Sequence, residues 1–214
     1  MNNNKISHLR LTILFVFMAL LPMSLQAGDS VKGNPENGSK LAAKKCDKCH
    51  GSGGISDDPD TPHLASLNAA YLLKQLKDYK SKVRDDRNMY KRVRKLDGQQ
   101  MADVASWYAS QTLPSIKPIA GLDIPQLVNK GDSSRSIPPC DVCHGEDGKT
   151  VAGETPVLAG QYADYLIYTM ENFADGSRSN DPGGAVQTII KKMSDVEIEA
   201  LAKYYAALGG RPAD

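Results

Sequence analysis

The motif Cys-x-x-Cys-His occurs twice in this chain of 214 residues. The first copy, CDKCH, runs from Cys46 to His50, and the second, CDVCH, runs from Cys140 to His144. Together the two copies contain all four cysteines of the sequence. Each copy brings two thiols and one imidazole within five positions, so the chain builds the same group of reactive or metal-binding side chains twice.

Three kinds of site use paired cysteines, and the sequence context separates them. A structural zinc site needs four ligands close together, whereas the second pair here lies 94 residues after the first. A thioredoxin-like redox pair follows a strand in a β-α-β unit, and the sequence shows no alternating strand pattern. In an exported chain, Cys-x-x-Cys-His is typical of covalent haem attachment, with thioethers to both thiols and the histidine as iron ligand. The sequence therefore predicts two haem c groups, held by Cys46, Cys49, His50, Cys140, Cys143 and His144.

Residues 1–27 have the three-part layout of a secretory signal peptide. A positive start with Lys5 and Arg10 leads to the apolar run LTILFVFMALLPMSL, which is followed by small residues. The uninterrupted apolar stretch Leu11–Leu21 is shorter than the roughly 20 residues that span a bilayer. We therefore expect the signal to be removed, and the mature chain to work in the periplasm without a transmembrane segment.

The mature sequence is an internal repeat. A set of residues from Cys46 to Tyr71 recurs 94 positions later, whereas the pair Tyr108-Ala109 recurs 97 positions later. The second copy therefore contains three extra residues in the loop between those two regions. Duplication with a separate motif in each copy favours two domains of roughly 90 residues each. The predicted division is residues 28–114 for domain one, a proline-containing linker at 115–125, and residues 126–214 for domain two.

Helical periodicity runs through both copies, and we expect an all-α fold. Apolar residues follow the i, i+3, i+4, i+7 spacing at positions 69–76 and 163–170. The last helix of each copy begins with a capping signal, at Asp97 and at Ser194, each with a glutamine or glutamate three positions later. Domains this small require something besides their own side chains to complete the core, and a haem supplies it.

Both halves resemble class I c-type cytochromes, and their tandem arrangement is similar to the dihaem cytochrome c4 family. The resemblance covers nearly all of the mature chain and implies two class I domains, each wrapped around one covalent haem. It implies that a proline twelve residues after the ligand histidine offers its carbonyl to the imidazole, and that a leucine two positions later packs on the haem. The residues at those positions are Pro62, Leu64, Pro156 and Leu158. The closing WYA and YYA helices are expected to pack near the start of each copy.

The second axial ligand of the iron is predicted differently in the two copies. Electron-transfer haems favour a methionine thioether there, which raises the potential. In cytochrome c4 relatives this methionine lies seven residues before the apolar residue that opens the last helix, which implies Met89 rather than Met101 in copy one. The same position in copy two is Val186, which cannot bind iron. Met193 is the side chain we assign there, with an open position, Met170, and Lys191 or Lys192 as the alternatives.

Charge divides unequally between the two halves. Residues 28–118 carry 16 basic and 11 acidic residues, whereas residues 119–214 carry 8 and 14. The densest basic stretch, Lys74 to Lys95, is interpreted as a docking or solvated surface. Its interspersed aspartates and the exported context argue against binding to nucleic acid.

Two haems in an exported chain favour an electron carrier that passes single electrons between redox proteins. The sequence does not name the donor or the acceptor; an oxidase, a reductase or a flavoprotein would each fit. In the alternative, the chain is the cytochrome subunit of a sulfur-compound-oxidising dehydrogenase, or such an enzyme itself, with an open second haem. Val186 motivates that alternative, although no acid-base pair or phosphate-binding loop is apparent. A haem ligand sensor is a third hypothesis, without a visible output domain.

Overall fold

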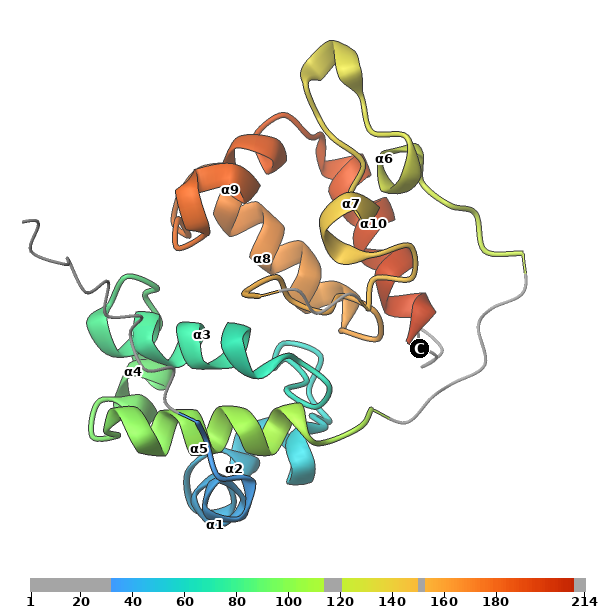
Figure 1. The fold of residues 1–214 in the computed structure, drawn as a ribbon. Helices are drawn as coiled ribbons and strands as arrows, with labels where there is room; N and C mark the ends of the chain where they lie inside the picture. Colours follow the sequence, from blue (N-terminus) through green and yellow to red (C-terminus); the bar gives the residue numbers. More distant parts are fainter. Residues whose placement is uncertain (1–31, 114–120, 150–152, 210–214) are drawn as a thin grey trace, which may run out of the picture. The chain divides into compact units, whose positions relative to one another are not determined.

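The computed structural model describes residues 32–113, 121–149 and 153–209. The predicted signal peptide and residues 115–120 of the predicted linker lie outside the described residues. Within the described ranges the chain is helical and forms no strand (Figure 1), so the predicted all-α fold class is confirmed. The helices are α1 (Pro35–Lys45), α2 (Asp47–His50), α3 (Ala69–Ser81), α4 (Arg87–Val93), α5 (Gly98–Ala109), α6 (Gln126–Asn129), α7 (Asp141–His144), α8 (Ala163–Asp175), α9 (Ala185–Ile190) and α10 (Asp195–Leu208). None of these helices is long and apolar enough to cross a membrane.

The first half is built from α1, α3 and α5, with α5 packed between the other two. Asp97 and Gln100 form the predicted capping box at the start of α5. Helix α1 approaches α5 closely at Gly38, where a Cβ would lie 2.0 Å from the Asp103 carbonyl oxygen, so the contact requires glycine. The buried core residues that these three helices contribute are Ala42, Leu72, Val104, Ala105 and Tyr108.

The second half repeats this plan around α8 and α10 but has no long first helix. Where the first half has the eleven-residue α1, the second has only the four-residue α6. The segment that corresponds to α1 in the repeat, residues 129–139, contains Gly131, Pro138 and Pro139. A proline inside a helix removes an N–H donor and clashes with the preceding turn, so this segment forms a loop. The apolar core of the second half contains Leu127, Val128, Ile137, Leu166, Leu201, Tyr204 and Tyr205.

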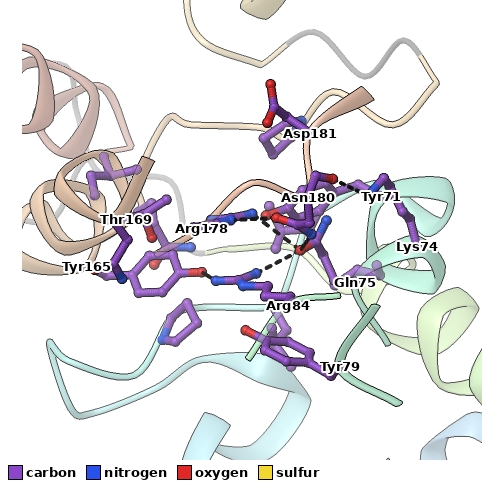
Figure 2. Close-up of a pocket in the computed structure, with 18 of the residues that line it drawn as sticks. Tyr71, Lys74, Gln75, Tyr79, Arg84, Tyr165, Thr169, Arg178, Asn180 and Asp181 are labelled. Atoms are coloured by element: carbon purple, nitrogen blue, oxygen red, sulfur yellow. Dashed lines mark hydrogen bonds between the residues drawn. The ribbon is translucent and has the colours of Figure 1, made fainter. Parts of the chain in front are cut away.

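The two halves contact each other through apolar and polar side chains. Val157 and Ala159 of the second half lie in the same buried cluster as Leu67 of the first. The Gln161 side-chain amide bonds both backbone groups of His63: its Oε1 accepts from the N–H, and its Nε2 donates to the carbonyl oxygen, each at 3.0 Å. The Tyr162 hydroxyl donates to the Ser56 carbonyl oxygen at 2.7 Å, and the Tyr162 ring packs on the His63 ring with centroids 4.3 Å apart. A second group of contacts joins α3 to the chain around α8 (Figure 2). The halves are therefore docked by specific hydrogen bonds as well as connected through the linker.

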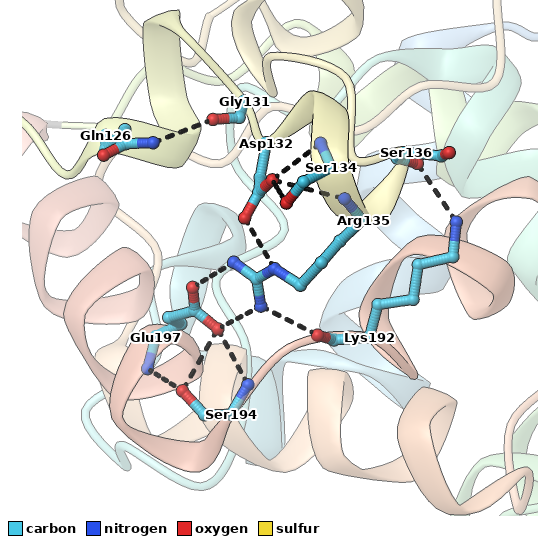
Figure 3. A network of polar contacts seen from close by, with 9 residues as sticks. All are labelled: Gln126, Gly131, Asp132, Ser134, Arg135, Ser136, Lys192, Ser194 and Glu197. Atoms are coloured by element: carbon cyan, nitrogen blue, oxygen red, sulfur yellow. Dashed lines mark hydrogen bonds and ion pairs between the residues drawn. The ribbon is translucent and has the colours of Figure 1, made fainter.

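Arg135 joins the loop after α6 to the start of α10 (Figure 3). Its guanidinium pairs with Glu197 at 2.6 Å and with Asp132 at 2.7 Å, and it donates to the Lys192 carbonyl oxygen at 2.9 Å. Glu197 also completes the predicted capping box with Ser194. Hydrogen bonds from Arg135, and then from the Ser194 backbone, lower the pKa of the Glu197 carboxyl to about 2.

Replacing Arg135 with glutamine is expected to lower the thermal stability at pH 7, by an amount that shrinks as the pH falls below 4.5. A carboxyl group whose pKa falls on folding stabilises the folded chain above its unfolded pKa, here 4.5, and that contribution is lost as the pH approaches 2. Thermal unfolding followed by circular dichroism across this pH range measures the difference between variant and parent. Lys130→Gln is the matched control, because Lys130 is exposed and forms no ion pair within the described residues. A pH-independent difference would contradict the role given to Glu197.

Candidate functional site

Each Cys-x-x-Cys-His motif forms a single helical turn that ends at a glycine. Helix α2 ends at His50 and α7 at His144, and the first cysteine of each motif precedes the turn as its N-cap. The residues that follow, Gly51 and Gly145, have φ angles of 74° and 79°. A Cβ on Gly51 would lie 1.8 Å from the Ile55 carbonyl oxygen, so a side chain is excluded there. The chain therefore turns sharply directly after the histidine in both halves.

The two motif histidines are held in the same way. His50 Nδ1 lies 3.0 Å from the Pro62 carbonyl oxygen, and His144 Nδ1 lies 3.1 Å from the Pro156 carbonyl oxygen. The hydrogen bond that the resemblance implied is therefore present in both halves. It places the N–H on Nδ1 and leaves the Nε2 lone pair of each ring free to bind a metal. Burial lowers the pKa of both imidazoles, which also favours the neutral ring.

The last helix of each half packs on the loop that follows its motif. The Tyr108 ring covers Gly54, where a Cβ would lie 2.6 Å from the ring Cδ1. The Tyr205 ring covers Gly148, where a Cβ would lie 2.8 Å from the ring Cδ1. The carbonyl oxygens of these two glycines accept hydrogen bonds from the N–H groups of the predicted haem-wall leucines, both at 2.8 Å. The closing helices thus lie near the start of each copy, as the resemblance implied.

A cavity of about 1640 Å³ lies against both motifs. This volume exceeds the roughly 300–1,000 Å³ of a pocket for one small molecule, so there is room for two large groups. The four cysteines are not in disulfides. All twelve predicted site residues line the cavity: Cys46, Cys49, His50, Pro62, Leu64, Met89, Cys140, Cys143, His144, Pro156, Leu158 and Met193.

The donor set fits a covalent haem in each half and does not fit structural zinc. Zinc of that kind needs four ligands, and among the described residues no three histidine, cysteine or carboxylate side chains gather as a metal cluster requires. Each half instead offers two free thiols and one oriented imidazole on the wall of a partly open cavity. These are the groups that thioether attachment and axial ligation need.

Two buried arginines lie where the halves meet, as Figure 2 shows, and neither forms an ion pair within the described part of the chain. Arg84 is 9% exposed and donates to Gln75 Oε1 at 2.8 Å and to the Tyr165 hydroxyl at 3.0 Å. Arg178 is 7% exposed and donates to Asn180 Oδ1 at 2.9 Å. Both line the cavity. Because a buried charge is costly unless it is paired, these two side chains are suited to hold an anion.

The charge balance around this pair of arginines is positive. Lys74 forms an ion pair with Asp78, whereas Arg84 and Arg178 have no carboxylate partner among the described residues and lie instead 4.7 Å and 4.4 Å from the ring centroids of Tyr79 and Phe173. Burial raises the pKa of the Tyr165 phenol, but the positive charges of the two arginines outweigh burial and lower the pKa to about 8. A phenol shifted toward its anionic form marks a region of positive potential. The carboxylates of a haem are anions of the kind that arginine pairs with, so this cluster also fits the predicted group.

For two residues of the basic stretch, the interpretation as a docking or solvated surface is wrong. Lys74 and Arg84 contact the other half of the chain, through the Asn180 carbonyl oxygen and the Tyr165 hydroxyl respectively. The cause is a turn after α3: Lys82 has a φ of 63°, and Arg84 folds back against α3. The rest of the stretch is exposed, namely Lys77, Lys80, Lys82, Arg87, Lys91, Arg92, Arg94 and Lys95.

Two groups of site residues escaped the sequence prediction. Gly51 and Gly145 follow the motif in both copies, and this repetition was the signal that could have identified them. Arg84 and Arg178 carry no such signal, since only their burial in the folded chain distinguishes them from surface arginines. Of the axial candidates, Met89 lies in α4, whereas Met193 packs against the apolar side chains of the second half.

Comparison with known proteins gives consistent matches. The family described as cytochrome c matches residues 35–112. The chain is 34% identical to cytochrome c4 from Thiocapsa roseopersicina over 194 residues, which covers 86% of this chain and 97% of that protein. It is also 34% identical to a thiosulfate dehydrogenase electron acceptor from Stutzerimonas stutzeri (strain A1501), with 89% of this chain and 91% of that protein covered. The crystal structure of reduced recombinant cytochrome c4 from Pseudomonas stutzeri matches with a TM-score of 0.76 and 30% identity, over 84% of this chain and 100% of that chain.

Proposed function

The chain belongs to the cytochrome c4 family, and we propose that it carries single electrons between redox proteins in the periplasm. Its relatives establish an electron-transfer cytochrome with two covalent haem c groups. The observation that supports the proposal best is the pair of equivalent motif turns, each with an oriented imidazole, on the wall of one cavity. The layout of residues 1–27 supports export, and the repeat supports domains at 28–114 and 126–214 joined by residues 115–125.

The proposed roles of the site residues follow from their chemistry. When bound, the haem iron supplies a one-electron Fe(III)/Fe(II) couple. The four cysteines hold the two groups covalently, and His50 and His144 bind iron through Nε2. The carbonyl oxygens of Pro62 and Pro156 keep both imidazole rings in a fixed orientation, which limits rearrangement when an electron arrives or leaves. Met89 is the proposed second axial ligand in the first half.

Arg84 and Arg178 are proposed to pair with haem carboxylates. Replacing Arg84 with glutamine is then expected to lower the reduction potential of at least one haem, by on the order of tens of millivolts. The direction follows because a fixed positive charge favours the reduced haem, whose iron carries one positive charge fewer. A redox titration followed by visible absorbance measures the shift. The exposed Arg94→Gln is the matched control, and equal shifts in the two variants would contradict a specific pairing.

The exposed residues of the basic stretch are the surface proposed to meet the electron donor. Lys91 and Lys95 lie at and beyond the end of α4, and both are exposed. A relative that matches most of this chain is described as an electron acceptor of thiosulfate dehydrogenase. We therefore propose a sulfur-compound-oxidising dehydrogenase with an acidic docking face as the donor, because complementary charges accelerate encounter.

The double variant Lys91→Glu with Lys95→Glu is expected to be reduced more slowly than the parent by thiosulfate and a purified thiosulfate dehydrogenase. The difference should be largest at low salt and should fade as the ionic strength rises, because salt screens the attraction. Stopped-flow absorbance measures the second-order rate constant. The exposed Lys130 and Lys203, replaced together by glutamate, provide the matched charge change in the other half. Electrostatic docking at the basic stretch would be contradicted if the two double variants had the same rate constant, or if the slowing did not depend on the salt concentration.

A second candidate function is favoured by Val186. If the second haem lacks a methionine ligand, a sulfur compound has access to its iron, and the chain itself oxidises that compound or forms the cytochrome subunit of an enzyme that does. Steady-state turnover of sulfide or thiosulfate with ferricyanide, in the absence of any dehydrogenase, separates this candidate from the carrier. A carrier shows no catalytic turnover in that assay.

A further inference from the structure

Helices α4 and α9 occupy corresponding places in the two halves, and the hydrogen bonds at their starts identify equivalent residues. In the first half, Asp86 Oδ1 accepts from the Met89 N–H at 2.7 Å. In the second half, Asp181 Oδ2 accepts from the Val186 N–H at 2.7 Å and from the Gln187 N–H at 3.2 Å. The longer loop of the second copy is accommodated between these two residues by the turn Pro182–Gly184. The Arg94 N–H donates to the Tyr90 carbonyl oxygen and the Lys191 N–H to the Gln187 carbonyl oxygen, so Tyr90 corresponds to Gln187. Val186, one residue earlier, therefore stands where Met89 stands, as the sequence alignment of the copies suggested.

The ends of the two helices correspond as well. The Leu96 N–H donates to the Val93 carbonyl oxygen at 2.9 Å, and the Met193 N–H donates to the Ile190 carbonyl oxygen at 2.9 Å. Leu96 is a core residue, 3% exposed. Met193 takes its place and packs against both apolar clusters of the second half. The extra loop residues are thus absorbed before α9 begins, and α9 is not shifted so as to bring Met193 to the place of Met89.

The other candidate ligands of the second iron, Met170, Lys191 and Lys192, also lie at positions that do not correspond to that of Met89. Met170 on α8 corresponds to Leu76 on α3 and packs against the same apolar clusters as Met193. Lys192 Nζ donates to the Ser136 carbonyl oxygen at 3.0 Å, and Lys191 is exposed at the end of α9. None of these side chains occupies the position that Met89 has in the first half.

We propose that no side chain binds the second iron opposite His144, and that this position takes a small uncharged ligand such as carbon monoxide or nitric oxide. Val186 packs against the buried apolar cluster of Phe173, Ile190 and Ile198, which Met170 and Met193 also contact. Such apolar side chains admit an uncharged diatomic molecule without the desolvation cost that a polar group would have. This proposal rests on the proposed haem attachment and ligation in the second half.

Carbon monoxide binding to the dithionite-reduced holoprotein tests the proposal. The expected result is one carbon monoxide per chain, with the absorbance of one haem shifted and the other unchanged. The ferric protein is expected to show the near-infrared methionine-to-iron band of one haem. A pyridine haemochrome assay first counts the haems, so that a deficit of haem counts against the proposed function. A protein with two haems that binds no carbon monoxide overturns this inference alone.

Two variants locate the effect. Val186→Met is expected to double the near-infrared band and to weaken carbon monoxide binding by on the order of tenfold or more, since an internal ligand then competes for the iron. Met193→Leu is expected to change neither the band nor the stoichiometry. Loss of near-infrared intensity in Met193→Leu would identify Met193 as a ligand and overturn the inference, as would a Val186→Met protein that still binds carbon monoxide like the parent.

Discussion

Replacing Cys140 and Cys143 together with alanine is expected to leave one covalent haem per chain in place of two. Thioether bonds survive extraction with acid acetone, whereas coordination by His144 alone does not hold the group once the imidazole is protonated. The measurement is the haem content per protein after extraction, by pyridine haemochrome. Cys46→Ala with Cys49→Ala is the matched variant in the other half and is expected to give the same count.

The same variants are expected to unfold at lower temperature than the parent, because a domain of roughly 90 residues relies on the haem to complete its core. The cavity walls around each motif, including Leu64 and Leu158, would otherwise face solvent. A double variant that retains two extraction-resistant haems would contradict the covalent attachment. The duplication predicts that each half acquires its haem independently. A variant that loses both haems would contradict that prediction.

The features that were predicted correctly from the sequence are those that depend on local spacing or on the repeat. The capping boxes at Asp97 and Ser194 each involve a partner three residues away, and both are present. The contacts of His50 and His144 with prolines twelve residues later depend only on the shared class I pattern. Where the repeat itself is imperfect, the two halves differ in structure: Pro138 and Pro139 interrupt the segment that corresponds to α1.

The contacts between the halves are a different case, because they join residues far apart in the sequence. Arg84 meets Tyr165 across 81 positions, and Gln161 meets His63 across 98. In the sequence, Arg84 looks like the solvated basic residues around it. Only the docking of the second half buries it. The asymmetry of the interface adds to the difficulty, since Val157 occupies in the second copy the position that His63 has in the first.

Met89→Val is expected to remove the near-infrared methionine-to-iron band from the ferric protein. It is also expected to lower the potential of the first haem, by on the order of 0.1 V or more, given that axial ligands shift haem potentials over about 0.8 V. The physical reason is that the thioether stabilises Fe(II) relative to Fe(III). Near-infrared absorbance and a redox titration measure the two effects, while the haem count should stay at two.

Met101→Val is the control for this change, because Met101 is a core residue of α5 that is 5% exposed. It is expected to reduce stability but to keep the band, so loss of the band in Met101→Val, or its persistence in Met89→Val, would contradict the assignment. Met89→Val also gives the first half the residue that the second half has at this place. If Val186 is what opens the second iron, both haems of that variant should bind carbon monoxide, whereas Val186→Met should weaken its binding to the second haem. The two substitutions therefore ask from opposite directions whether one side chain separates the chemistry of two otherwise equivalent sites.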